Sequence, residues 1–390
     1  DKIAPEPAIV SWMVGVSAVV STFCTFLVGT WGDRIGKRKP FICVGYIFWG
    51  LFTFLFGATE MIPKNPLFIA AAAVVLADAV MSFFGSLGND GGFSPWTTDI
   101  SNEQNRGKLG GVLAVMPVFA TIFGAVVSGF LIEKLDFFAF FGLMGGVVAI
   151  MGFVALFTLK DSPHLAPKRD EKGFWHQFLS VFNGKTIREN QELFWVFAVM
   201  TVYFIGFNVY FPYITIYFVN YLGYDYGMTG VIQGVGLLTA ALLTIPAAKI
   251  IDRGKMALVI FAALICNTTG LVLVSLSQKL PVLLIGVFGA GIGYILVLQS
   301  LTAWMKNLYP GEQRGQFEGL KQIFFVCIPM IAGPAIATPV INRLGIQAEI
   351  NGAVGMVPAP SLFLISAALT LFTLIPLNIA AKLCRKRNGA

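Results

Sequence analysis

The chain has 390 residues, of which 56% are hydrophobic and only 12% are charged, with a formal net charge of +7 and a mean hydropathy of +0.78. Soluble globular domains carry about a quarter charged residues and are less than half apolar. A water-soluble fold has too little interior to bury this much apolar surface. The composition therefore excludes a soluble domain and indicates an integral membrane protein.

Apolar segments recur along the whole chain, each with about the 20 residues that a helix needs to cross the hydrocarbon layer. Eleven such segments are present, at 8–31, 40–60, 66–90, 109–133, 137–159, 193–222, 227–250, 256–277, 281–305, 319–342 and 359–383. Glycines lie within these segments, where they let helix backbones approach closely in lipid. We predict an all-α polytopic membrane protein with eleven visible spans.

The basic residues are distributed unevenly between the connections that join these spans. Of the 27 Lys and Arg residues, 22 lie in one alternating set of connections, and the other set holds only Lys2, Lys64, Lys134, Lys279 and Arg343. This is the positive-inside pattern of membrane topology. It accounts for the net charge without a nucleic-acid partner, and we expect none. We predict a multi-pass protein of the plasma (cytoplasmic) membrane whose N-terminus lies outside and whose C-terminus is cytoplasmic.

One long polar connection, residues 161–191, separates two groups of spans. We therefore predict an N-terminal transmembrane half over 1–160, a cytoplasmic linker over 161–191 and a C-terminal half over 192–390. Five linker residues share one helical face: Phe174, Trp175, Phe178, Leu179 and Phe182. They predict a short amphipathic helix that lies in the membrane interface or packs on the protein.

Two sequence signals recur in the same order in both halves. Residues 32–39 (GDRIGKRK) are answered by 252–255 (DRGK), and Arg106-Gly107 is answered by Arg314-Gly315. Two spans precede the second copy of the first signal, but only one precedes the first copy. We therefore expect that the first helix of a six-plus-six arrangement is absent from this sequence, and that the visible spans are helices 2–12.

The first repeated signal resembles the signature loop of the major facilitator superfamily, Gly-x-x-x-Asp-Arg-x-Gly-Arg-Lys/Arg. The matching residues are Gly29, Asp33, Arg34, Gly36, Lys37 and Arg38. The resemblance implies two pseudo-symmetric six-helix halves that work by alternating access. It also implies a cytoplasmic gate of Asp33, Arg34, Gly36, Lys37, Arg38, Asp99, Arg106, Asp252, Arg253 and Arg314. Simple topology-setting charge is the alternative for residues 37–39.

Two further motifs are similar to those of the glycoside–pentoside–hexuronide:cation symporters. They are Trp96-Thr97-Thr98-Asp99 followed by Asn105-Arg106-Gly107, and Tyr309-Pro310-Gly311 with Arg314-Gly315. This resemblance implies a sugar or glycoside as substrate and H⁺ or Na⁺ as coupling ion. Those symporters carry acidic cation ligands on the helix that matches the first visible span, whereas residues 7–30 contain no acid.

Asp78 is the ionisable residue closest to the centre of a predicted span, about 18 Å along the helix from Pro66. A charge at that depth is costly, which makes it a functional candidate. Ser82, Gly85 or Ser86, and Asn89 share its helical face, and Asp90 lies beside that face. We predict that Asp78, Asn89 and Asp90 bind substrate or cation. A hydrogen-bonded cluster that only packs helices is the alternative.

In the superfamily fold the third, sixth and ninth visible spans line the cavity. Their polar and aromatic residues suit a sugar, because aromatic faces cover ring C–H groups and amides bind hydroxyls. The candidates are Tyr203, Asn208, Tyr294, Gln299 and Trp304, with Lys321 on the tenth span as a counter-charge. The alternatives are packing or interfacial roles for the aromatic residues, and a snorkelling Lys321.

The sequence gives no support for catalysis. Residues 184–186 (GKT) lack the upstream glycine of a phosphate-binding loop, the two histidines lie in the linker, and no metal or triad spacing occurs. We expect a secondary transporter that is not an enzyme, needs no cofactor beyond H⁺ or Na⁺, and works as a monomer on a small-molecule solute in the bilayer. The alternatives are an exporter of amphipathic drugs or lipids, and a transporter-like membrane sensor.

Overall fold

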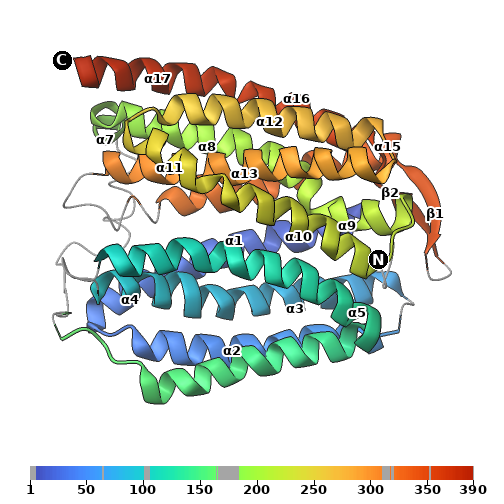
Figure 1. Cartoon of the computed structure of the whole chain (residues 1–390). Coiled ribbons are helices and arrows are strands. Elements are labelled where there is room, and N and C mark those ends of the chain that lie inside the picture. Colours follow the sequence, from blue (N-terminus) through green and yellow to red (C-terminus); the bar gives the residue numbers. More distant parts are fainter. Residues whose placement is uncertain are drawn as a thin grey trace. The chain divides into compact units, whose positions relative to one another are not determined.

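The computed structural model describes residues 6–63, 66–100, 106–163, 165, 184–309, 317, 320–350 and 353–389. These residues form two compact units (Figure 1). Unit 1 comprises Asp1–Pro117, Leu131–Gln177 and Ile350–Ala353, and unit 2 comprises Val118–Phe130, Phe178–Glu349 and Val354–Ala390.

Unit 1 is built from long apolar helices. They are α1 (Pro7–Ile35), α2 (Lys39–Ala58), α3 (Leu67–Gly88), the short α4 (Ser94–Asp99) and most of α5 (Arg106–Thr158). A 3₁₀ turn (Thr59–Met61) follows α2, and a π-helical turn (Asn89–Phe93) joins α3 to α4. The boundaries follow local chemistry, since proline opens α1 and α2, where its missing N–H costs nothing.

Glycines set the helix spacing in unit 1. A Cβ atom added to Gly45 would lie 2.4 Å from the Gly88 backbone, and one added to Gly50 would lie 2.4 Å from the Gly145 carbonyl oxygen. These distances leave no room for a side chain, so α2 contacts α3 and the second part of α5 backbone to backbone. Close approach of this kind stabilises helix pairs in lipid, where van der Waals packing replaces the hydrophobic effect.

Unit 2 contains the remaining elements. Its helices are α7 (Gly184–Glu189), α8 (Gln191–Tyr210), α9 (Ile214–Ile216), α10 (Tyr226–Leu242), α11 (Thr244–Asp252), α12 (Met256–Leu276), α13 (Leu280–Leu308), α15 (Ile328–Leu344), α16 (Ser361–Phe372) and α17 (Leu374–Gly389). A 3₁₀ turn (Phe211–Tyr213) and π-helical turns (Tyr217–Tyr221 and Ile323–Cys327) interrupt the regular helices. The paired strands β1 (Ile346–Ile350) and β2 (Ala353–Val357) lie between α15 and α16.

The core of unit 2 is densely packed around α8. Phe197, Tyr203 and Trp304 are at most 1% exposed there, and Phe197 stacks on Phe324 with ring centroids 5.2 Å apart. In this core α8, α13 and α17 pack against one another. Their packing holds the polar residues of these helices in fixed positions.

The structure corrects two expectations. Within the described residues, nine helices are long and apolar enough to cross a membrane, so the count of eleven spans is not confirmed. Predicted spans 109–133 and 137–159 correspond to the two helical parts of α5, which are separated by non-helical backbone at Asp136 (φ 68°). Predicted span 227–250 is divided near Leu243 into α10 and α11. The fold is also not purely α-helical, because it contains the β1–β2 hairpin. The sequence did not predict this hairpin. The two six-helix halves remain a prediction.

Two neighbouring glycines of α5 test the packing. Gly145→Ala places a methyl group 2.5 Å from the Gly50 carbonyl oxygen, whereas a Cβ atom at Gly146 meets nothing within 4 Å. Overpacking costs about 1–3 kcal/mol, so Gly145→Ala should lower the melting temperature of the detergent-solubilised protein by several degrees. Gly146→Ala is the matched control and should leave it unchanged or slightly higher. Equal melting of both variants would contradict the packing described for α2 and α5.

Candidate functional site

The carboxylate of Asp78 lies on α3 and accepts a hydrogen bond from the hydroxyl of Ser17 on α1. Ser17 is buried, and Asp78 is partly buried. Among the described residues, no Lys or Arg forms an ion pair with Asp78. A carboxylate in an apolar span with one neutral partner keeps most of the energetic cost of its buried charge. Binding a cation or a proton would lower this cost.

A second polar group lies where α3 passes into the π-helical turn. The Asn89 amide donates to Asp90 Oδ1 at 3.1 Å, and the Tyr46 hydroxyl donates to Asn89 Oδ1 at 3.4 Å. Gly91 and Gly92 of the same turn pack against α1 and α2 with no space for a Cβ atom. π-Helical turns often mark functional sites. The amide of Asn89 and the carboxylate of Asp90 contact each other in this turn, about three helical turns beyond Asp78.

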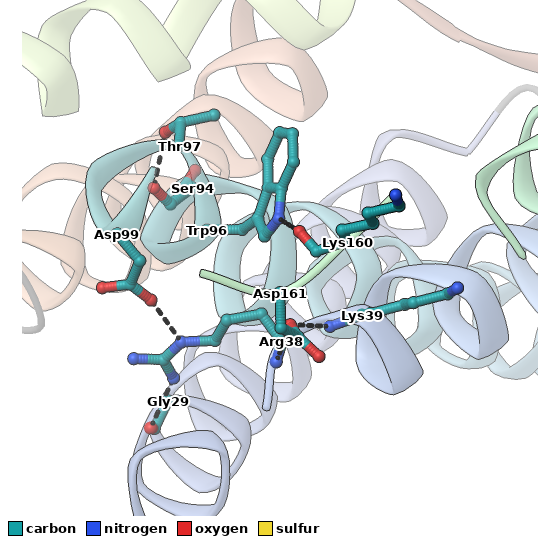
Figure 2. Close-up of polar contacts among 9 residues, drawn as sticks. All are labelled: Gly29, Arg38, Lys39, Ser94, Trp96, Thr97, Asp99, Lys160 and Asp161. Atoms are coloured by element: carbon teal, nitrogen blue, oxygen red, sulfur yellow. Dashed lines mark hydrogen bonds and ion pairs between the residues drawn. The ribbon is translucent and has the colours of Figure 1, made fainter. Parts of the chain in front are cut away.

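At one end of unit 1, Arg38 forms a buried ion pair (Figure 2). Its Nε lies 3.1 Å from Asp99 Oδ2, and its Nη1 donates to the Gly29 carbonyl oxygen at 3.2 Å. The side chain of Arg38 is 6% exposed and that of Asp99 is 22% exposed. The pair joins the start of α2, the end of α4 and the last turns of α1.

Glycines make room for this guanidinium. A Cβ atom at Gly32 would lie 2.4 Å from Arg38 Nη1. Gly36 ends α1 in the left-handed conformation (φ 64°) and donates its N–H to the Gly32 carbonyl oxygen at 2.9 Å, which is the usual glycine termination of a helix. Of the signature residues, Gly36 therefore turns the chain after α1, whereas the glycine that admits the arginine is Gly32, which is not a position of the signature.

Residues that follow α5 hold the same region in place. Asp161 Oδ1 accepts the backbone N–H groups of Arg38 at 2.7 Å and Lys39 at 2.9 Å, and the Trp96 indole donates to the Lys160 carbonyl oxygen at 2.9 Å (Figure 2). Arg38 cannot cap α2 with its own side chain. A carboxylate from a distant segment satisfies the first N–H groups and complements the helix dipole.

The structure brings together only part of the predicted gate. Arg38, Asp99 and Gly36 lie in the cluster described above. The side chains of Arg34 and Lys37 are exposed, as are those of Asp252 and Arg253 in unit 2. The side chains of Asp33 and Arg106, and the whole of Arg314, lie outside the described residues.

Two of the unit 2 candidates lie deep inside its core. Trp304 is fully buried and donates its indole N–H to Glu192 Oε1 at 2.8 Å. Tyr203 is 1% exposed, and its hydroxyl has no hydrogen-bond partner within the described part of the chain. Trp304 therefore contributes to helix packing. The Tyr203 hydroxyl remains without a hydrogen bond to any described residue.

Of the other unit 2 candidates, Asn208 is buried and Tyr294 and Gln299 are partly buried. Tyr294 stacks on Phe207 with centroids 4.7 Å apart. The Asn208 amide donates to the Phe204 carbonyl oxygen at 2.8 Å, and the Gln299 amide donates to the Thr244 carbonyl oxygen at 3.2 Å, while Gln299 Oε1 accepts no bond from a described residue. Lys321 on the tenth predicted span is partly buried.

Sequence reasoning missed three of the residues that complete these groups. Ser17, the partner of Asp78, is an ordinary small polar residue in an apolar span and carries no signal. Asp161 was assigned only to the linker, although an arginine at the start of α2 leaves the helix in need of a cap. Glu192 opens α8 as a first-turn acid, but its indole partner is more than 100 residues away along the chain.

Comparisons with known proteins agree with one another on the fold. Residues 3–334 match the sequence profile of the Major Facilitator Superfamily. Multidrug resistance protein 1 of Bacillus subtilis (strain 168) is 21% identical over 84% of this chain and 79% of its own length. Quinolone resistance protein NorA of Staphylococcus aureus (strain MRSA252) is 23% identical, also over 84% of this chain and 79% of its own length.

Solved structures show the same architecture. The crystal structure of the nucleoside transporter NupG covers 96% of this chain and 91% of its own with a TM-score of 0.70, at 11% identity. A bacterial homologue of the iron transporter ferroportin, in an inward-facing state, covers 96% and 97% with a TM-score of 0.64, also at 11% identity. At these identities the likeness concerns the fold alone.

The two arginines of the signature loop allow a matched test of the ion pair. Breaking a buried pair by removing one partner costs about 3–5 kcal/mol, so Arg38→Ala should lower the melting temperature markedly. Arg34→Ala removes the same charge from an exposed side chain and should change it little. Thermal unfolding of both variants in detergent measures the difference, and a loss of stability in Arg34→Ala as large as in Arg38→Ala would contradict the cluster.

Proposed function

Because the chain belongs to the major facilitator superfamily, whose members are transporters, we propose that it is a secondary active transporter that moves a small organic solute by alternating access, coupled to a cation bound at Asp78. The observation that carries the coupling proposal is the carboxylate of Asp78 on an apolar helix, hydrogen-bonded to Ser17 and without an ion-pair partner among the described residues.

The proton is the coupling ion that this site suits. Sodium sites in transporters recruit backbone carbonyl groups from unwound helix segments. The helix around Asp78 is regular from Leu67 to Gly88, so its carbonyl groups are used within the helix. A single carboxylate with a hydroxyl donor binds and releases a proton without further ligands.

In the proposed mechanism the Arg38–Asp99 pair controls the equilibrium between the two conformational states of the transporter. A dry ion pair is stable in one state of the transporter and becomes hydrated when the cytoplasmic side opens, so it biases the equilibrium between the two states. The positive-inside pattern supports a position of this end of unit 1, and of the C-terminus, on the cytoplasmic side of the plasma membrane.

For the substrate we favour a sugar or glycoside taken up in symport. The loop motifs that resemble the glycoside–pentoside–hexuronide symporters point in this direction, and so do the polar groups of unit 2. Gln299 Oε1 and the Tyr203 hydroxyl are buried without partners among the described residues. Tyr294 offers an aromatic ring on the same helix as Gln299. Hydroxyl groups of a sugar satisfy such atoms, and its C–H faces pack on aromatic rings.

Export of amphipathic compounds is the second candidate. It is favoured by the similarity of the chain to two relatives, a multidrug resistance protein and a quinolone resistance protein. The two candidates differ in direction and substrate. Proteoliposomes loaded with a panel of sugars and glycosides should show counterflow of a radiolabelled sugar under the first, and efflux of ethidium or a quinolone under the second. Binding of a solute without any exchange across the membrane would contradict both transport candidates and would favour a transporter-like membrane sensor.

The coupling role of Asp78 is tested by Asp78→Asn. This variant cannot exchange a proton at position 78, so solute accumulation against a gradient should fall by at least tenfold, while passive counterflow persists. Asp136→Asn changes an exposed acid in the same way and should leave accumulation intact. Both proteins should be present at equal levels in the membrane. Undiminished accumulation by Asp78→Asn would remove the carboxylate from the coupling mechanism.

A further inference from the structure

The last helix of unit 2 has two opposite faces at its C-terminal end. Leu377, Ala380 and Cys384 are at most 8% exposed and pack in the core around α8. With about 100° of rotation per residue, Lys382, Arg385 and Lys386 fall within roughly 100° of arc on the side away from Ala380 and Cys384. All three basic side chains are exposed, and none forms an ion pair within the described part of the chain.

An ion pair fixes the rotation of this helix. Arg387 Nε lies 3.2 Å from Glu192 Oε2, and the Trp304 indole donates to Glu192 Oε1 at 2.8 Å. The carboxylate of Glu192 thus joins the start of α8, the end of α13 and the end of α17. Arg387 is itself 43% exposed in its side chain, but its position on the helix lies on the side of Ala380, and its ion pair with Glu192 favours the rotation that leaves the other three basic residues facing away from the core.

We propose that Lys382, Arg385 and Lys386, called here the α17 basic face, bind the phosphate of an anionic phospholipid headgroup in the cytoplasmic leaflet. Helix α17 is the end of an apolar segment long enough to cross a membrane, so its last turns lie at headgroup depth when the segment spans the bilayer. The cytoplasmic leaflet carries negative charge, and clustered Lys and Arg beside a span attract it. Long basic side chains reach the headgroups while their stems stay against apolar surface.

A positive-inside topology needs only the number of basic residues on the cytoplasmic side. Binding of a headgroup needs them on one face. The two explanations therefore differ in how they respond to the position of the charges, and this difference can be measured independently of transport.

The test uses the purified full chain in a neutral detergent, with dioleoyl phosphatidylglycerol or dioleoyl phosphatidylcholine added at increasing mole fraction. A ligand that binds the folded state raises its melting temperature. The triple variant K382Q/R385Q/K386Q removes the α17 basic face. The control variant R188Q/K249Q/K306Q removes the same number of exposed charges from the ends of three other helices, α7, α11 and α13.

We expect phosphatidylglycerol to raise the melting temperature of the wild type more than phosphatidylcholine does. The α17 variant should lose at least half of this difference, and the control should keep it. An equal loss in both variants, an unchanged difference in the α17 variant, or an equal stabilisation by soluble glycerol phosphate would overturn the proposal. If the triple variant does not fold, K382Q and R385Q are measured singly, and each should weaken the apparent affinity for phosphatidylglycerol roughly fivefold. Unchanged affinity for phosphatidylglycerol in both single variants would also overturn the proposal.

Discussion

The cost of placing a charge in an apolar membrane protein governs the arrangement described above. Only 12% of the residues are charged, and several charged side chains that are wholly or partly buried among the described residues have specific partners. Arg38 is enclosed by Asp99 and the Gly29 carbonyl oxygen, and Glu192 by Trp304 and Arg387. Asp78 has only a hydroxyl partner among the described residues, which leaves it the carboxylate best suited to exchange a proton.

In the proposed transporter the three groups would contribute through different physical effects. The Arg38 cluster ties three segments of unit 1 with charge-assisted hydrogen bonds, and Asp161 adds a helix cap from a segment more than 100 residues away. Such contacts are made or lost together when a helix end moves, which is what a two-state gate requires. Glycines set the geometry, because Gly32 leaves the space that the guanidinium fills. The π-helical turn at Asn89–Phe93 adds a polar group that lies between Asp78 and Asp99 along the chain.

The sequence was sufficient to predict features that depend on local patterns. Apolar length predicted membrane-crossing helices, and the signature loop predicted the family that the profile match confirms. Short motifs also named Arg38, which belongs to the signature loop, and Asp99, which belongs to the Trp96–Asp99 motif. The partners Ser17, Asp161 and Glu192 were not predictable, because each pairing depends on tertiary packing between distant segments. The divided helices α10 and α11 and the β1–β2 hairpin were missed for a related reason, since average hydropathy does not report backbone breaks.

The central claim, that solute transport is coupled to protons, is tested most directly by proton movement driven by a solute gradient. Proteoliposomes containing a trapped pH dye and no membrane potential receive the transported solute outside. Symport predicts that the lumen acidifies as the solute enters, and exchange of solute for protons predicts that it becomes alkaline. In either case the signal should disappear in vesicles without protein. Solute entry at the full wild-type rate with no change in internal pH would contradict the account.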